Sequence, residues 1–205
     1  MKTLIEVGAF DGTDSLNYHS NGYVVYTFEP HQGLYAALVE RTKDLENYTV
    51  IPKAVSLVDG KTQFNVCKAG GASSILPFRS DEELLQVWTE HRTDVHYSGT
   101  SYEVETTRLD TFIEANHLEN TTIDFIHIDA QGVDLECLKS LGKYIENVKA
   151  GVVETVKDRN KSIYIGQDEN TLENVEKFLL ANGFKIAGVE PNDNIDCEYN
   201  VFFEK

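Results

Sequence analysis

The chain has 205 residues, of which 41% are hydrophobic and 25% charged, and its formal net charge is −16. This length supports one sizeable core, so we expect a single domain over residues 1–205. Nucleic acids and anionic membranes are bound through clustered Lys and Arg, so the acidic charge predicts neither as a partner. No apolar run is long enough to span a bilayer.

Cysteine use and the N-terminus bear on the compartment. Cys67, Cys137 and Cys197 are far apart in the sequence and form no Cys-x-x-Cys pair. An odd count without such spacing disfavours both a disulfide framework and a structural zinc site. The first residues enter patterned sequence directly, with no apolar signal segment. We therefore expect a soluble protein of the cytoplasm.

Strand-like and helix-like stretches alternate along the chain. Runs of β-branched and aromatic residues predict strands, and apolar residues three or four positions apart predict helices. The predicted strands are residues 3–7, 23–28, 48–52, 123–128, 150–153, 184–189 and 198–203. The predicted helices are residues 12–20, 33–41, 134–141 and 171–182. This order predicts an α/β fold with a doubly wound, mostly parallel seven-stranded sheet, and the final two strands, which no helix separates, predict an antiparallel edge hairpin.

Residues 56–122 exceed what one strand-to-strand connection needs. They contain a helix-like piece at 81–89 and a Tyr- and Thr-rich strand near 101–107. Insertions of this length usually form a lid or a binding edge. The Ser73-Ser74 pair follows two glycines here, and this loop either closes over a ligand or is an ordinary connection. Further candidates for contact with a ligand in this insertion are Trp88, His91, Arg92, His96, Tyr97 and Tyr102.

The first predicted strand runs into a glycine-bracketed turn, Glu6-Val7-Gly8-Ala9-Phe10-Asp11-Gly12. Ligands of open parallel sheets bind beyond the carboxyl ends of the strands, and glycine there lets a ligand approach the backbone. A dinucleotide site requires Gly-x-Gly-x-x-Gly, but Phe10 replaces the second glycine. The turn therefore predicts a nucleoside without phosphates, and Glu6 and Asp11 favour a cationic one.

The second predicted strand ends at Glu29, followed by Pro30. A carboxylate at this strand end can accept hydrogen bonds from two ribose hydroxyls, as in many nucleoside-binding sheets. The ribose signal fits both NAD and S-adenosylmethionine, and the missing phosphate glycine favours the second. The alternative interpretation is that Glu6 and Glu29 are solvated strand ends.

Several segments together resemble the FkbM-type family of class I methyltransferases, which depend on S-adenosylmethionine (SAM). The matching segments are residues 5–15, 28–30, 53–55, 107–112, 123–136 and 200–203, together with Glu154. The resemblance implies a Rossmann-like methyltransferase fold, SAM as cofactor with S-adenosylhomocysteine (SAH) as product, and methylation of an oxygen on a small molecule such as a sugar. Read with the turn and strand-end signals, it gives these expected cofactor-binding residues: Glu6, Gly8, Ala9, Asp11, Gly12, Ser15, Glu29, Pro30, Ala54, Val55, Ser73, Ser74 and Asp129.

The sequence departs from the family pattern at three positions. Family members commonly carry Asn where Asp11 stands, Lys where His127 stands and often Glu where Gln131 stands. Many relatives also have helices before the first strand. We therefore expect an acceptor pocket that is either more open or completed by a second subunit in a homo-oligomer.

Candidate catalytic residues lie at the ends of the fourth and fifth predicted strands. Methyl transfer to an alcohol needs alignment of the oxygen and a base that removes its proton. Asp129 is the first candidate, as base or as acceptor orienter, or else as a helix cap. Glu154 is a second carboxylate, and His127 is either a base or a core histidine. Two carboxylates could hold Mg²⁺, but no third ligand is evident and a metal-free reaction is favoured.

Three functions remain open. The leading hypothesis is a SAM-dependent O-methyltransferase acting on a small-molecule or carbohydrate acceptor. A nicotinamide-dependent oxidoreductase is disfavoured by Phe10 and by the lack of a Tyr-x-x-x-Lys pair. A non-catalytic binding or assembly subunit with the same fold is the third alternative.

Overall fold

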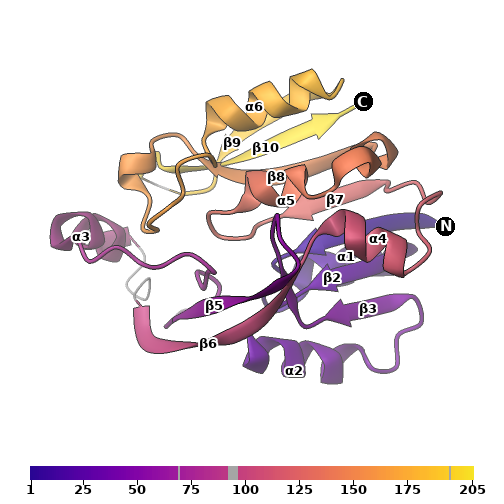
Figure 1. Cartoon of the computed structure of the whole chain (residues 1–205), viewed down its shortest axis with the longest axis horizontal. Helices are drawn as coiled ribbons and strands as arrows, with labels where there is room; N and C mark the ends of the chain where they lie inside the picture. The colour runs from indigo at the N-terminus through magenta and orange to yellow at the C-terminus, as the bar shows by residue number, and fades with distance from the viewer. Residues whose placement is uncertain (69, 92–96, 194) are drawn as a thin grey trace.

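A seven-stranded sheet forms the centre of the molecule in the computed structural model, which describes residues 1–68, 70–91, 97–193 and 195–205 (Figure 1). Its strands are β1 (Lys2–Val7), β2 (Tyr23–Phe28), β3 (Tyr48–Ile51), β7 (Phe125–Ile128), β8 (Ala150–Val156), β9 (Lys185–Pro191) and β10 (Glu198–Glu204). They are ordered β3-β2-β1-β7-β8-β10-β9. The first five are parallel to one another, whereas β10 pairs antiparallel with both β8 and β9. The predicted fold class is confirmed.

Helices connect the parallel strands and cover the sheet. They are α1 (Thr13–Ser20), α2 (Gln32–Thr42), α3 (Glu82–His91), α4 (Leu109–Ala115), α5 (Asp134–Lys139) and α6 (Leu172–Ala181), with short 3-10 helices at Gly142–Asn147 and Arg159–Lys161. The apolar strand β7 carries Ile126 and Ile128 into the core, where they join Leu135 and Leu138 of α5. No helix in the described ranges has the length and apolar character needed to cross a bilayer.

A second, smaller sheet lies beside the main one. It consists of β4 (Lys53–Val55), β6 (Tyr97–Thr107) and β5 (Gly60–Cys67) in that order, with β6 parallel to β4 and antiparallel to β5. In Figure 1, α3 lies beyond this sheet, at the end of the molecule opposite both chain termini. The expected insertion at 56–122 therefore divides in two, because α4 at its end buries Leu109 and Ile113 in the main core.

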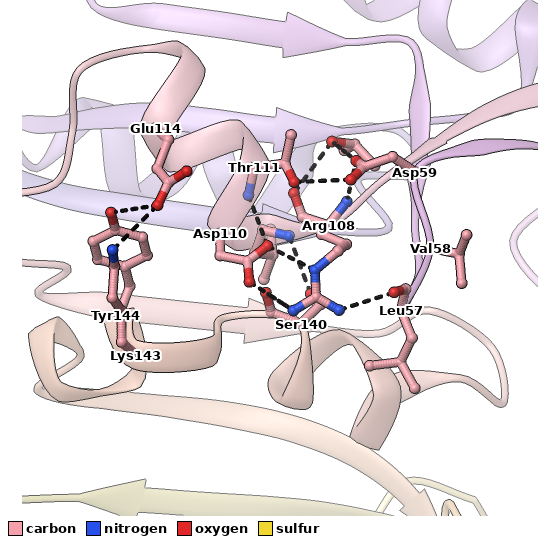
Figure 2. A network of polar contacts seen from close by, with 12 residues as sticks. Leu57, Val58, Asp59, Arg108, Asp110, Thr111, Glu114, Ser140, Lys143 and Tyr144 are labelled. Atoms are coloured by element: carbon pink, nitrogen blue, oxygen red, sulfur yellow. Dashed lines mark hydrogen bonds and ion pairs between the residues drawn. The ribbon is translucent and has the colours of Figure 1, made fainter.

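Arg108, between β6 and α4, ties the small sheet to the main one (Figure 2). Its guanidinium donates to the Asp110 carboxylate at 2.8 and 2.6 Å and to the Leu57 carbonyl at 2.8 Å. Asp59, in the turn before β5, accepts the Arg108 backbone N–H at 2.9 Å and the Thr111 hydroxyl at 2.8 Å. The hydrogen bond from Arg108 lowers the pKa of Asp110, so the pair stays charged. This network joins the turn between β4 and β5 of the small sheet to the start of α4.

We expect Arg108→Ala to lower the free energy of unfolding by about 1.5–3 kcal/mol, because the Leu57 carbonyl loses its guanidinium donor and the Asp110 carboxylate keeps only the Thr111 N–H. Arg159→Ala is the matched control. Its guanidinium lies 3.6 Å from Asp168 and both side chains are mostly exposed, so the expected loss is below about 0.5 kcal/mol. Urea denaturation of both variants measures the difference, and equal losses would contradict the anchoring role.

Candidate active site

A cavity of about 740 Å³ opens at the carboxyl ends of the parallel strands. At one end it is lined by Glu29, after β2, and by Ala54 of β4. At the other end it is lined by Asp193 and Ile195 of the β9–β10 turn. Residues of the small sheet and of α3, among them Phe64 and Trp88, line it as well. This volume is in the range of pockets that enclose small molecules and cofactors.

The predicted site residues divide into two groups. Those that line the cavity are Gly8, Glu29, Pro30, Ala54, Val55, Ser73, Asp129 and Glu154. Those that do not line it are Glu6, Ala9, Asp11, Gly12, Ser15, Ser74 and His127. In the second group, Glu6, His127 and Ser15 lie within β1, β7 and α1, whereas the other four lie in the β1–α1 turn and in the loop after β5.

Gly8 is required by backbone packing at the cavity floor. Its φ is +86°, and a Cβ built on it would lie 1.9 Å from the carbonyl oxygen of Asp129. Gly12, with φ +75°, has a similar constraint, since its Cβ would lie 2.4 Å from a methyl carbon of Leu38. The sequence suggested room for a ligand at both positions, but the structure shows that chain segments fill the space beside both glycines.

Local hydrogen bonds stabilise the rest of the turn between β1 and α1. Ala9 is buried and its backbone N–H donates to the Phe28 carbonyl at 3.1 Å. Asp11 is exposed and accepts the Thr13 N–H at 2.9 Å, which caps the start of α1. The buried Ser15 hydroxyl lies 2.7 Å from that of Tyr48. These interactions hold the turn in place.

Glu29 is a buried carboxylate at the cavity wall. Its side chain accepts the backbone N–H groups of Phe10 and His31, both at 2.7 Å. Burial raises the pKa of Glu29 to about 7, although these two hydrogen bonds act in the opposite direction. Since Glu29 is 4% exposed and Glu6 only 1%, the alternative that both are solvated strand ends is wrong.

His127 and Glu6 form a separate polar row across the main sheet. Glu6 pairs with Thr27 on one side and His127 on the other, and its carboxylate accepts the Thr27 hydroxyl. His127 Nδ1 lies 3.7 Å from Glu6 Oε1. Burial lowers the pKa of His127, but attraction to the Glu6 carboxylate outweighs it, so the net shift is upward. Asp14 of α1 adjoins this pair, which therefore lies toward α1 and away from the cavity lining.

The loop at residues 70–74 closes the cavity from the side of the small sheet. The Ser73 hydroxyl accepts the Cys67 N–H at 3.0 Å. The Ser74 hydroxyl donates to the Gln131 carbonyl at 2.7 Å, which joins this loop to the one after β7. The ring of Phe10 lies against Gly70 and Gly71, where a Cβ would be only 3.3–3.5 Å from it.

Three candidates for ligand contact in the insertion are described by the structure. Trp88 lines the cavity but is 1% exposed and donates its indole N–H to the Lys161 carbonyl at 2.7 Å. Tyr97 stacks on Phe78, outside the cavity lining, and the Tyr102 hydroxyl accepts the Gln32 N–H at 3.0 Å. Arg92 and His96 lie outside the described residues, as does the side chain of His91.

Gln131 joins the two candidate catalytic carboxylates and was not among the predicted site residues. Its amide nitrogen donates to Asp129 Oδ1 at 2.5 Å and to Glu154 Oε2 at 3.1 Å. The Asn192 amide donates to Glu154 Oε1 at 2.5 Å. Burial, followed by the charge of Asp129, raises the pKa of Glu154 well above its ordinary value. The available signal for Gln131 was its position within the segment that resembles the family most specifically.

Asp134, at the start of α5, holds the loop that carries Asp129. Its carboxylate accepts the backbone N–H groups of Ala130 and of Gly132, the latter at 3.0 Å, and the Asn170 amide at 2.7 Å. Oxygens of Asp129, Asp134 and Glu154 lie within 4.8 Å of one another, close enough to hold a cation. Asp129 and Glu154 line the cavity, whereas Asp134 does not, and both of its oxygens already accept hydrogen bonds.

The charge of the cavity wall indicates the class of ligand. Glu29, Asp129, Glu154 and Asp193 line it. Of the described lining residues only Lys53 is cationic, and it forms an ion pair with Glu105 at 3.0 Å. A carboxylate-rich wall favours a cationic ligand and repels phosphates. Residues of this kind fit the sulfonium-bearing nucleoside SAM.

The sheet order, the cavity at the carboxyl ends of its strands and the buried Glu29 define a SAM-dependent methyltransferase of class I. The chain belongs to the FkbM methyltransferase family, since the model of the methyltransferase FkbM domain matches residues 6–186. SAM is accordingly the cofactor. No curated protein matches the chain.

Solved structures share the fold at low sequence identity. TrmK of M. capricolum, solved with SAH, aligns over 100% of this chain and 62% of its own, with 7% identity and a TM-score of 0.53. An rRNA methylase from Streptococcus thermophilus aligns over 100% of this chain and 86% of its own, with 12% identity and a TM-score of 0.50. At these identities the similarity shows the fold alone.

Gly8→Ala and Gly22→Ala separate backbone strain from steric overlap. Gly22 has φ +82° and nothing within 4 Å of a built Cβ, so it shares only the strain. Both variants should lose about 1–2 kcal/mol from the left-handed conformation. Gly8→Ala should lose more and also lose SAH affinity, because the new methyl must displace the Asp129 backbone. Thermal unfolding and calorimetric titration with SAH test this, and equal behaviour of the two variants would refute it.

Proposed function

We propose that the protein is an O-methyltransferase that methylates a hydroxyl group of a neutral small molecule, with a sugar or glycan as the favoured class. The observation that carries this proposal is the Asp129 carboxylate, which lines the cavity at the end of β7. A base at this place can accept the proton of an alcohol held in the cavity.

The β2 side of the cavity is the proposed cofactor end. SAM supplies a methyl group already activated on a sulfonium. Each oxygen of Glu29 accepts one backbone N–H and has capacity for a second donor, so the carboxylate can accept ribose hydroxyls. Ala54 and Val55 supply apolar wall at the same end. Ser73 and Gly8 line the cavity and complete the proposed contacts among the predicted residues.

The β8–β9 side is the proposed acceptor end. Asp129 orients the acceptor hydroxyl and takes its proton as the methyl group is transferred. Burial and the charge of Asp129 raise the pKa of Glu154, so this group binds a proton more readily than an ordinary glutamate, next to Asp129. The small sheet and α3, through Phe64 and Trp88, form the proposed lid over the cavity.

The charge of the cavity wall supports one acceptor class over the others. A phosphorylated acceptor would bring negative charge to a wall with four carboxyl residues and one paired lysine. The overall charge of −16 opposes a nucleic acid in the same way. A hydroxylated neutral molecule avoids both penalties, and its hydroxyls can bond to the carboxyl and amide groups at the acceptor end.

We expect SAH affinity to rise with pH until about pH 7 and then to level off. Below its pKa of about 7 the free Glu29 carboxyl is protonated and must release its proton to accept ribose O–H groups. Affinity should then fall by up to about tenfold for each pH unit below 7. Calorimetry from about pH 5.5 to 8.5 measures this slope, which Glu29→Gln should abolish. A slope unchanged in Glu29→Gln would rule out the ribose role.

A screen with isotope-labelled methyl groups tests the reaction itself. We expect transfer to neutral sugars or glycans, and none to phosphorylated sugars or to RNA. Asp129→Asn should lower the rate by about 10²–10⁴-fold and still bind SAH, because only the base is lost. Asp44→Asn, at an exposed position after α2, is the matched control.

Three outcomes would contradict the proposal. Transfer to a phosphorylated acceptor or to RNA would overturn the acceptor class. An active Asp129→Asn variant would overturn the assigned base. SAH binding without transfer to any acceptor class would favour a non-catalytic binding subunit.

A further inference from the structure

The Gln131 side chain connects two carboxyl groups that would otherwise face each other across the cavity wall. Its Nε2 donates one N–H to Asp129, from the end of β7, and the other to Glu154, on β8. Its Oε1 lies 2.7 Å from the Tyr164 hydroxyl. The amide group therefore bonds to three residues from different parts of the fold, namely Asp129, Glu154 and Tyr164.

The partners fix the orientation of the amide. A flipped amide would place its oxygen beside two carboxyl groups and its N–H groups toward a hydroxyl. The observed orientation gives both carboxyl groups a donor and gives the amide oxygen the Tyr164 O–H, which also lies 2.8 Å from the Ala72 carbonyl. Gln131 is 8% exposed, so water does not offer an easy substitute for these bonds.

The backbone under Gln131 is held as firmly as its side chain. Its φ is +54°, a conformation that few non-glycine residues adopt. The Gln131 carbonyl accepts the Ser74 hydroxyl, and Asp134 binds the N–H groups on both sides, at Ala130 and Gly132. A strained residue held from three directions at a site indicates that its position matters for function.

Oxygens of Asp129 and Glu154 lie within 4.8 Å of each other. Two carboxyl groups at this separation cannot both ionise without a large cost in free energy, so such pairs share one proton. The neighbouring charges bear on which group holds it. The titratable groups near the pair are His127, Asp134, Tyr164 and Glu198. Glu154 is only 4% exposed, whereas Asp129 is less buried. Burial therefore favours the proton on Glu154.

We propose that Gln131 is a positioning residue whose amide holds Asp129 and Glu154 as a pair sharing one proton, with the charged Asp129 turned to the acceptor. This inference rests on the proposed function, because it assigns Asp129 the role of base. A neutral amide performs this role without adding a charge, whereas a glutamate at this position would place a third carboxyl group in the cluster.

Carbon-13 NMR of glutamate-labelled full-length protein tests the pair without any acceptor. The Glu154 carboxyl signal is assigned by its loss in Glu154→Gln and followed from about pH 4 to pH 9. We expect a midpoint well above that of an ordinary glutamate. Gln131→Met keeps the side-chain length but removes both N–H donors. The Glu154 midpoint should then rise further, by about one pH unit, because the ionised form loses a hydrogen bond.

Further variants separate this role from a merely structural one. Gln131→Glu should also raise the midpoint, by adding a like charge. Gln63→Glu, at an exposed position on β5, adds the same charge far from the pair and should leave the midpoint unchanged. Tyr164→Phe should shift it in the same direction as Gln131→Met, by a smaller amount, and it serves if the Gln131 variants do not fold. SAH binding reports whether each variant is folded.

Each possible result of these measurements supports or overturns a stated part of the proposal. An ordinary Glu154 midpoint in the wild type overturns the shared proton. A midpoint that stays the same in folded Gln131→Met, or in folded Tyr164→Phe if that is the variant available, overturns the role of Gln131. If the midpoints shift as expected but Asp129→Asn still transfers methyl groups, the positioning role of Gln131 stands and the proposed base is wrong. The two failures are therefore distinguishable.

Discussion

The arrangement of the site depends on the close approach of two strand ends, β1 and β7, at Gly8. The Asp129 N–H donates to the Val7 carbonyl at 3.0 Å, and the Asp129 carbonyl lies where any side chain on Gly8 would be. The Gly8 N–H in turn donates to the Phe28 carbonyl of β2 at 3.0 Å. These bonds bring the ends of three strands together, so that Glu29 and Asp129 border one cavity.

Concentrating carboxyl groups at this edge has an energetic cost that the surrounding donors reduce. Glu29 receives two backbone N–H groups, Asp134 two more and an amide, and Glu154 two amide groups. Hydrogen bonds of this kind stabilise a buried carboxylate but do not fully replace water. The pKa values of Glu29 and Glu154 therefore remain raised, and that of Glu29, at about 7, lets this group change charge near neutral pH. A cationic ligand at the same edge relieves part of this cost.

Local patterns in the sequence predicted the main sheet and part of the site. Apolar runs marked each main strand, and the interval from Gly8 to Glu29 marked the strand-end carboxylate. The small sheet was harder to predict, because β4 is three residues long and pairs with β6 some fifty positions later. His127 lies on β7 and Asp129 directly follows it, but the His127 side chain lies beside Asp14 of α1. Periodicity alone does not reveal this difference. Gln131 escaped notice because its role depends on Glu154, Tyr164 and Ser74, which are distant in sequence.

Phe10 shows how one residue can favour one cofactor over another by shape and charge together. Phe10 stands in the first turn, where a dinucleotide site would keep open backbone for phosphates, and its ring lies against Gly70 and Gly71. Its backbone N–H donates to the Glu29 carboxylate at 2.7 Å instead of facing an anion. The donor that a phosphate would need is thus used to stabilise an internal carboxylate. The same turn that excludes a diphosphate therefore strengthens the negative wall that suits a sulfonium, and cofactor choice follows from a single local arrangement.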